Sequence, residues 1–405
     1  MFDFLAYFSV AFFITSLVTP IVRRWANLLE LVDHPSDRKV HVHVRARLGG
    51  TAIAFSFLTC LFLVALLHRT NSALLVPLQE GNAYEVIRTH PFGTRFFVAA
   101  LIVFLLGAWD DWKGASPTVK FAWQIIAAFI VLWNQPKFSL LRGFGFTNEI
   151  YQYLDLGLGI FWVVYVCNAF NLIDGLDGLA AGTAFFASLG LFSLAIVVKN
   201  AALALLILLL AGAVLGFLQF NRYPARIFMG DSGSLFIGFC LAVFSLRLCT
   251  TFTTYGLLFA APVIAIGVPL ADTTLAIFRR WVRYSNILKA NEPKNIFCFK
   301  KLFAADKRHI HHRMLAVMGH HRRAVNYFYV INFLLFVVVT TLAVFHVALG
   351  TWGILAIYTG LMVALYALLL RLGYYEIIVL QRTPDDPPMK RKEKPSTTSR
   401  LAPVE

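Results

Sequence analysis

The sequence predicts an all-α polytopic membrane protein, and its composition is the first reason. Of its 405 residues, 59% are hydrophobic and only 14% are charged. A soluble domain with this balance would expose too much apolar surface, so lipid must surround most of the chain. A helix needs about 20 mainly apolar residues to cross a bilayer. About eleven segments approach that length: 2–22, 49–67, 95–109, 118–134, 155–170, 179–198, 201–218, 234–250, 255–278, 325–346 and 350–371.

The basic residues predict the orientation of these spans. No Lys or Arg precedes the first span, so we expect a retained helix with its N-terminus outside rather than a cleaved signal peptide. The loops that would then face the cytosol hold 28 Lys and Arg, against 6 in the outside loops. This positive-inside pattern places the C-terminus in the cytosol. It also accounts for the formal charge of +15 without a nucleic acid partner.

The domain organisation that we expect is one integral membrane domain over 1–372, followed by a cytosolic tail over 373–405. The tail combines prolines, Ser, Thr and a basic run, which is typical of a disordered segment resting on anionic membrane lipids. Four of the five cysteines lie in apolar segments. We interpret them as small core residues, since their spacing indicates neither a disulfide framework nor a zinc site.

Polar residues gather at the expected cytosolic ends of the spans, beginning with the stretch GAWDDWKG. Asp110 and Asp111 end the third span, where the C-terminus of a helix already carries partial negative charge. A cation is expected to compensate them. For this pair alone, a solvated loop beside Lys113 is the simpler interpretation. The other acidic loops on the same side favour a shared site.

The second loop, NAFNLIDGLDGLAAG, follows the fifth span. Asp174 and Asp177 are three residues apart, on one face of a helical turn, and Asn168 and Asn171 lie one turn earlier. A single aspartate near a helix N-terminus is usually a cap. A stripe of two aspartates and two asparagines is better matched to a nucleotide sugar or a metal ion.

The third loop, FMGDSGSLFIG, places Asp231 between Gly230 and Gly233 directly before an apolar helix. Backbone N–H groups at such a position bind anions. The carboxylate is also a suitable ligand for a hard cation that bridges phosphate oxygens. Because a Gly-Asp-Ser-Gly turn is common by itself, the motif supports the site only together with the other loops.

The fourth loop, DKRHIHHRML, holds His309, His311 and His312 beside Arg313. Three histidines can bind zinc, but the neighbouring cations would repel a metal, and the carboxylates elsewhere are better matched to Mg²⁺ or Mn²⁺. Imidazole and guanidinium donors favour a diphosphate. The alternative is a basic juxtamembrane segment in which the histidines are incidental.

A fifth element, DHPSDRKVHVHVRARLGGTAI, joins the first two spans. Lys39 and His41 add cations on the expected cytosolic side, and Gly49 and Gly50 begin the next helix. A positive-inside loop is the simpler interpretation of this segment taken alone.

These five elements, in this order, resemble the polyprenyl-phosphate N-acetylhexosamine-1-phosphate transferase family, and within it the bacterial undecaprenyl-phosphate GlcNAc-1-phosphate transferases. The resemblance covers roughly residues 30–325 and includes PLADTT…RR. The related phospho-MurNAc-pentapeptide translocases carry three consecutive histidines followed by an acid, whereas this chain reads His-Ile-His-His-Arg. That order favours the N-acetylhexosamine branch. Val44 and Ala46 stand where the family has prolines, a departure that bears on the choice of sugar nucleotide.

The resemblance implies transfer of GlcNAc-1-phosphate from UDP-GlcNAc to undecaprenyl phosphate, with release of UMP, by about eleven helices and a cytosolic active site in the bacterial cytoplasmic (inner) membrane. The product would start a lipid-linked cell-envelope polysaccharide, such as the O-antigen of lipopolysaccharide. By similarity, the catalytic residues are Asp110, Asp111 and Asp231, and Asp231 and Asp111 hold Mg²⁺ or Mn²⁺. The residues that match substrate-binding positions are Lys39, His41, Asn171, Asp174, Asp177, His309, His311, His312 and Arg313.

Three alternatives stay open from the sequence. The same chemistry could use another UDP-N-acetylhexosamine. A secondary transporter or an intramembrane aspartyl protease would instead need ionisable residues near the middle of the membrane, and the candidates for that place are Arg247 and Asp272. A homodimer is neither required nor excluded.

Overall fold

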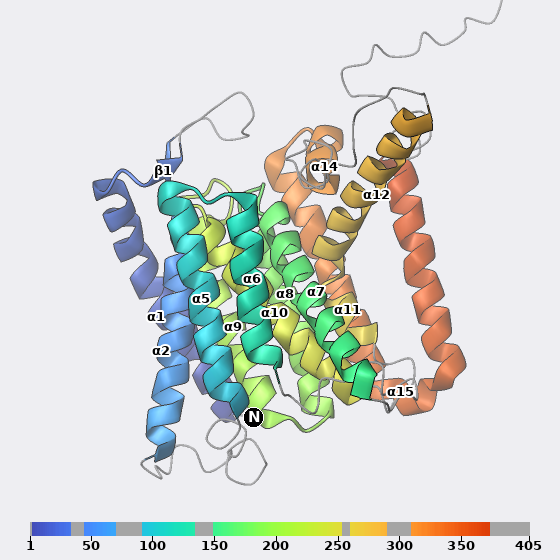
Figure 1. Cartoon of the computed structure of the whole chain (residues 1–405), viewed down its shortest axis with the longest axis horizontal. Coiled ribbons are helices and arrows are strands. Elements are labelled where there is room, and N and C mark those ends of the chain that lie inside the picture. Colours follow the sequence, from blue (N-terminus) through green and yellow to red (C-terminus); the bar gives the residue numbers. More distant parts are fainter. Residues whose placement is uncertain are drawn as a thin grey trace, which may run out of the picture.

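The computed structural model describes residues 2–33, 44–69, 91–133, 149–252, 260–289 and 309–372. Helices dominate these residues (Figure 1). Two strands of two residues each, β1 (Val32–Asp33) and β2 (Arg45–Ala46), pair antiparallel. The helices are α1 (Phe2–Leu28), α2 (Gly49–Arg69), α5 (Pro91–Lys113), α6 (Pro117–Leu132), α7 (Glu149–Ile173), α8 (Leu179–Val197), α9 (Ala201–Asn221), α10 (Asp231–Phe252), α11 (Ala261–Ala265), α12 (Gly267–Lys289), α14 (Ile310–Met318) and α15 (His321–Arg371).

Eight helices of the described residues are long and apolar enough to cross a membrane: α1, α5, α7, α8, α9, α10 and the two halves of α15. The halves of α15 meet at Gly350, whose φ of 58° and ψ of −174° interrupt the helix. The apolar stretches of α2 and α6 are shorter, over Gly49–Val64 and Pro117–Leu132. The predicted all-α polytopic membrane fold is therefore confirmed. The count of eleven spans and their orientation stay predictions.

The span predicted over 255–278 is interrupted in its described part. The short helix α11 ends at Ala265, and α12 begins at Gly267. Pro269 explains the break, because its ring excludes the carbonyl of the residue four positions earlier and it has no N–H to donate. Beyond this point α12 continues to Lys289 and is not among the helices that meet the length and hydropathy of a span.

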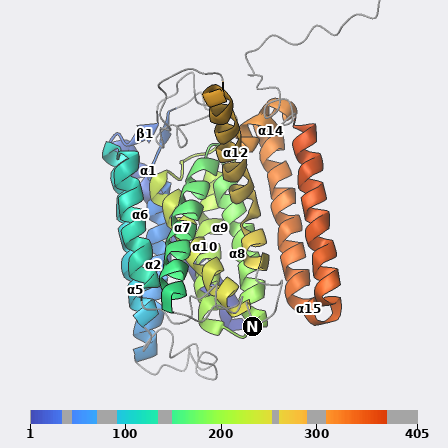
Figure 2. The ribbon, with the colours of Figure 1, turned by 45° about the vertical axis from the view of Figure 1, so that its right-hand side comes forward.

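The helix α10 lies in the interior of the bundle (Figure 2) and packs against α2, α5, α7 and α8. Its aromatic side chains interlock with those of its neighbours: the rings of Phe236 and Phe57 are 5.7 Å apart, and those of Phe244 and Phe96 are 5.4 Å apart. These contacts bury apolar surface around the whole circumference of α10. Its N-terminus, which carries the GDSG motif, is thereby held in a fixed place.

The loops that carry the sequence motifs lie at one end of the bundle, opposite the N-terminus of the chain (Figure 1). The strand β1 and the short helix α14 mark the two sides of this end. Between them the C-terminal ends of α5 and α7 meet the N-terminal ends of α2, α8 and α10. Four segments that are distant in the sequence are thus brought to one surface: the start of α2, the end of α5, the turn between α7 and α8, and the start of α10.

Candidate active site

The RLGG and GDSG motifs form one structural unit. The N–H of Gly49 donates to the carbonyl of Phe228 at 2.9 Å. A Cβ atom at Gly50 would lie only 1.9 Å from the backbone nitrogen of Gly233. A side chain at Gly50 cannot be accommodated, because backbone atoms fill the space on the other side. The glycines thus let the first turns of α2 and α10 touch.

Asp111 caps the N-terminus of α10 from a different helix. Its Oδ1 accepts the N–H of Asp231 at 2.9 Å, and its Oδ2 accepts the N–H of Ser232 at 3.0 Å. These donors have no partner within α10, and the positive end of the helix dipole favours a carboxylate here. Gly230, with φ of +72°, makes the approach possible, since a Cβ there would lie 2.4 Å from Oδ2. The structure thus places Asp111 beside Asp231 and engages both of its oxygens.

Lys120, to which the sequence analysis gave no role, links two of the predicted aspartates. Its Nζ lies 2.7 Å from Oδ2 of Asp110 and 2.5 Å from Oδ2 of Asp231. Asp110 also accepts the N–H of Ala115 at 2.6 Å. Lys120 is therefore the cation that the adjacent aspartates of α5 require. A signal was available: the Ser116 cap and Pro117 begin α6 immediately before Lys120, so it lies in the first turn, at the end of the span.

The turn between α7 and α8 is fixed from three sides. Asp177 accepts the N–H of Ala225 at 2.9 Å, and Asn171 donates to the hydroxyl of Ser234 at 3.0 Å. The carbonyl of Gly178 accepts the hydroxyl of Tyr329 at 2.8 Å. Asn171 and Asp177 therefore hold the turn against α10 and the chain before it.

Asp174, the first residue of this turn, has no such hydrogen-bond partner among the described residues. Burial raises the pKa of Asp174 to about 8, and the negative charges of Asp231, Asp111 and Asp177 add to this effect. The four carboxylates cannot all be ionised at low cost without an added positive charge. This part of the site therefore favours a cation.

A cavity of about 330 Å³ opens among these groups. We call it the acidic cavity. Its lining residues are Asp33, Arg47, Asp110, Asp111, Asn171, Asp174, Gly175, Leu176, Asp177, Asn221, Phe228, Gly230, Asp231 and His312. Arg47 is ion-paired with Asp33 across the β1–β2 pair. Oxygen donors of this kind match Mg²⁺ or Mn²⁺, and the shared contact of Asp110 and Asp231 with Lys120 shows that both carboxylates can converge on one positive charge.

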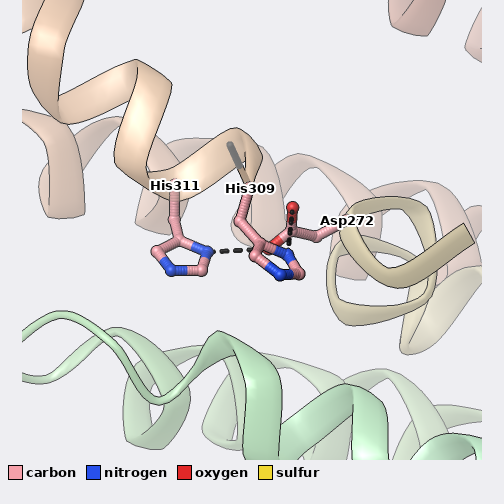
Figure 3. A group of neighbouring side chains, drawn as sticks. All are labelled: Asp272, His309 and His311. Carbon is pink, nitrogen blue, oxygen red and sulfur yellow. Dashed lines mark hydrogen bonds and ion pairs between the residues drawn. The ribbon is translucent and has the colours of Figure 1, made fainter. Parts of the chain in front are cut away.

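The structure separates the three predicted histidines. His312 lines the acidic cavity. His309 and His311 are 3% and 1% exposed and face the buried carboxylate of Asp272 instead (Figure 3). Arg313 follows His312 in α14 and is not among the residues that line the cavity. The predicted Lys39 and His41 lie outside the described residues.

Comparison with known proteins decides the family. The family model described as Glycosyl transferase family 4 matches residues 94–249. A probable undecaprenyl-phosphate N-acetylglucosaminyl 1-phosphate transferase of Bacillus subtilis (strain 168) is 34% identical over 333 residues, 81% of each chain. A decaprenyl-phosphate N-acetylglucosaminephosphotransferase of Mycobacterium leprae (strain TN) is 33% identical over 334 residues, 77% of each chain. The chain belongs to the polyprenyl-phosphate N-acetylhexosamine-1-phosphate transferase family.

A further similarity is confined to part of the chain. A phospho-N-acetylmuramoyl-pentapeptide-transferase of Limosilactobacillus fermentum is 40% identical over 154 residues, 36% of this chain and 47% of that protein.

Membership of the family makes the protein an integral membrane phospho-N-acetylhexosamine-1-phosphate transferase, as the motifs predicted. The motifs GAWDDWKG, NLIDGLDG and MGDSG all lie within the residues that the family model matches.

Proposed function

We propose that this transferase moves GlcNAc-1-phosphate from UDP-GlcNAc to undecaprenyl phosphate. An oxygen of the lipid phosphate attacks the β-phosphorus of UDP-GlcNAc, the bond from that phosphorus to the bridging oxygen breaks, and UMP leaves. The product is undecaprenyl-diphosphate-GlcNAc. The observation that carries the proposal is the acidic cavity, in which Asp110, Asp174 and Asp231 come together from three separate loops. The names of the Bacillus subtilis and Mycobacterium leprae relatives support a polyprenyl phosphate as the acceptor and N-acetylglucosamine phosphate as the transferred group.

We further propose that Asp231 and Asp110 hold a Mg²⁺ or Mn²⁺ ion. Held there, such an ion would supply positive charge that offsets the negative charge developing during transfer. Asp111 was predicted as the second ligand and as a catalytic group. Because both of its oxygens accept backbone N–H groups of α10, we assign it the task of fixing the position of Asp231.

The other residues in and around the acidic cavity have separable roles in this proposal. Lys120 neutralises the two carboxylates that it bridges and supplies a positive charge for the phosphates. Asn171, Asp174 and Asp177 form the surface for the nucleotide sugar. His312, which lines the cavity, donates to a phosphate oxygen, and Arg313 adds positive charge beside it. Lys39 and His41, which lie outside the described residues, stay predicted substrate-binding residues.

Transfer by direct attack needs little help from a base. The second pKa of a phosphate monoester is about 6, so the lipid phosphate is mostly dianionic at neutral pH. The protein's contribution is then to place the two phosphates and to offset their charge. A covalent aspartyl phosphate is the alternative, and a radiolabelled phospho-enzyme trapped in Asp110→Asn or Asp111→Asn would establish it.

The biological setting follows from the same proposal. The enzyme would work at the cytosolic face of the bacterial cytoplasmic membrane, where UDP-sugars are found, and its product would start a lipid-linked envelope polysaccharide. O-antigen, a common antigen and a teichoic acid all fit this chemistry.

The test is turnover by the purified protein in lipid, supplied with radiolabelled UDP-GlcNAc and undecaprenyl phosphate, with Mg²⁺ or Mn²⁺ present or chelated. We expect metal-dependent label in the lipid together with released UMP. Label transferred only from a different UDP-N-acetylhexosamine would keep the reaction and correct the sugar. Folded protein that transfers label from none of these donors would contradict the proposal.

A further inference from the structure

A buried carboxylate outside the acidic cavity organises the histidine motif. Asp272, in the first turns of α12, is 3% exposed. Its Oδ1 accepts the N–H of Ile310, the first residue of α14, at 2.6 Å. Its Oδ2 lies 2.7 Å from Nδ1 of His311, and Nδ1 of His309 lies 3.3 Å from Oδ1 (Figure 3). We call Asp272, His309 and His311 the Asp272 cluster.

The Asp272 cluster has the composition of a metal site, since one potential ligand atom from each residue lies within 4.8 Å of the other two. The distances favour hydrogen bonds instead. Tetrahedral Zn²⁺, with bonds of about 2.0–2.2 Å, would separate neighbouring ligand atoms by about 3.4 Å. Oδ2 of Asp272 and Nδ1 of His311 are only 2.7 Å apart, which leaves room for one shared proton. The other carboxylate oxygen is already engaged by the N–H of Ile310.

The cluster connects directly to the acidic cavity. The rings of His311 and His312 are 4.4 Å apart, and His312 lines the cavity. On its other side His311 packs against the turn between α7 and α8: a Cβ at Gly175 would lie 2.8 Å from Nε2 of His311. His311 is thus held between Asp272 and the turn that contains Asp174. Through it, Asp272 determines where the first turn of α14 meets the cavity.

We propose that Asp272 is a positioning residue of the transferase: it holds His311 and the N-terminus of α14, and so places His312 against the nucleotide sugar. In this arrangement His309 and His311, which the sequence suggested as substrate-binding, support His312 and do not contact substrate. The inference rests on the proposed function, because it assigns His312 to the UDP-sugar.

Chemistry explains why an aspartate occupies this position. A carboxylate can accept hydrogen bonds from the His311 imidazole and from a backbone N–H at once, and it can attract the His309 imidazole 3.3 Å away. Its negative charge favours the tautomer of His311 that carries a proton on Nδ1. An asparagine at 272 keeps one oxygen for the N–H of Ile310 but turns an NH₂ group toward His311. His311 must then change its tautomer or its position. Partners that orient metal-bound histidines typically contribute about 10–100-fold to activity, and we expect an effect of the same order for a partner that orients His311.

The experiment compares Asp272→Asn, His312→Ala and the double variant with the wild type in lipid. We expect Asp272→Asn to lower kcat/KM by about 10–100-fold, mainly through a higher KM for the UDP-sugar, while KM for the lipid phosphate is unchanged. The double variant should be no worse than His312→Ala within about twofold, because both changes remove one function. Asp155→Asn is the matched control, since Asp155 is a buried carboxylate, 5% exposed, near the opposite end of α7 from Asn171.

Hydrogen exchange provides a readout that needs no substrate. In Asp272→Asn we expect faster exchange in peptides covering 310–318 and unchanged exchange in 117–132. His311→Ala tests the same link if Asp272→Asn does not fold. Additive losses in the double variant, an equal rise of both KM values, or unchanged exchange in α14 would overturn the proposal. So would a transition metal that survives EDTA dialysis in the wild type and is lost in Asp272→Asn. A wild type that is inactive with every UDP-N-acetylhexosamine, but shows the exchange difference, would refute the proposed function and leave the positioning of α14 supported.

Discussion

The acidic cavity and the Asp272 cluster both depend on aspartate side chains, but the aspartates have opposite surroundings in the two regions. In the cavity, Asp110 and Asp231 share the ammonium of Lys120, and Asp174 is surrounded by other negative groups. In the cluster, one carboxylate faces a backbone N–H and two imidazoles and is almost fully buried. Acids that outnumber their partners are ready to bind a cation or a ligand. A carboxylate whose acceptors are all engaged fixes structure instead.

Asp231→Asn should have the largest effect on the cavity side of this comparison. Loss of the carboxylate removes the proposed metal site, so we expect metal-dependent turnover to fall by about 10³-fold or more. The cap of α10 uses the backbone N–H of residue 231, which the substitution leaves in place. Thermal stability should therefore be close to that of the wild type. Turnover within tenfold of the wild type at saturating Mg²⁺ would remove Asp231 from the proposed metal site.

Lys120→Met removes the positive charge that Asp110 and Asp231 share, and it should affect turnover and Mn²⁺ binding in opposite directions. Without the ammonium, Asp110 and Asp231 repel each other, and we expect turnover to fall by about 10²-fold because the phosphates lose a fixed positive charge. Mn²⁺ should bind about tenfold more tightly, since a competing cation is gone. Initial rates and a Mn²⁺ titration measure both effects. Weaker Mn²⁺ binding in this variant would show that Lys120 does not compete with the metal.

Gly50→Ala tests whether the cavity depends on the contact between α2 and α10. The new Cβ would lie 1.9 Å from the backbone of Gly233, so the two helices must separate. Overpacking of this kind costs about 1–3 kcal/mol, and we expect lower thermal stability together with reduced turnover. Gly157→Ala is the matched control, because among the described residues no heavy atom outside its own stretch of α7 lies within 4 Å of its Cβ position. Equal stability of the two variants would show that this contact is not needed.

Asp174→Asn should give the smallest change of these four variants, and the change concerns thermal stability. The pKa of Asp174 is raised from its ordinary value of 3.8 to about 8. Between these two pH values the folded state retains a proton that the unfolded chain releases, so the free energy of unfolding of the metal-free protein falls as pH rises. Asparagine has no carboxyl group to ionise, so the variant does not lose stability in this way as pH rises. In EDTA at pH 8 we expect the variant's Tm to exceed that of the wild type by about 2 °C.

The pH dependence is the control for this prediction. The difference in Tm should shrink toward pH 4, and saturating Mn²⁺ should reduce it at pH 8 by supplying the missing positive charge. A difference that is independent of pH would mean that the charge of Asp174 is not its cause. Turnover of Asp174→Asn should be reduced under all of these conditions, because the nucleotide-sugar surface has changed.

Hydropathy and the order of the motifs predicted the membrane spans and the grouping of the polar residues, because both depend on local composition. The spans follow from apolar runs, and Asp110, Asp174, Asp231 and His312 could be assigned to one end of the bundle by counting membrane crossings. Such local patterns do not indicate which residues of different helices are in contact. Lys120 and Asp231 are 111 positions apart in the chain, and no local spacing connects them. Lys120 was therefore assigned only to a span.

The histidine motif shows a second limit. Three nearby histidines look alike in the sequence, and all were expected to bind substrate. Their separation depends on Asp272, 39 positions before His311, which holds two of the rings away from the cavity. The break at Pro269 was visible as a residue type, but the apolar character of 255–278 outweighed it.

Mn²⁺ binding measured by electron paramagnetic resonance in the presence of UDP tests the central claim, that the acidic cavity holds a divalent cation with the phosphates of the nucleotide sugar. The comparison is between the wild type, Asp231→Asn and Asp155→Asn in the same lipid. The account predicts one bound Mn²⁺ per chain in the wild type and in Asp155→Asn, and none in Asp231→Asn at the same concentration. Wild-type Mn²⁺ binding by Asp231→Asn would contradict it.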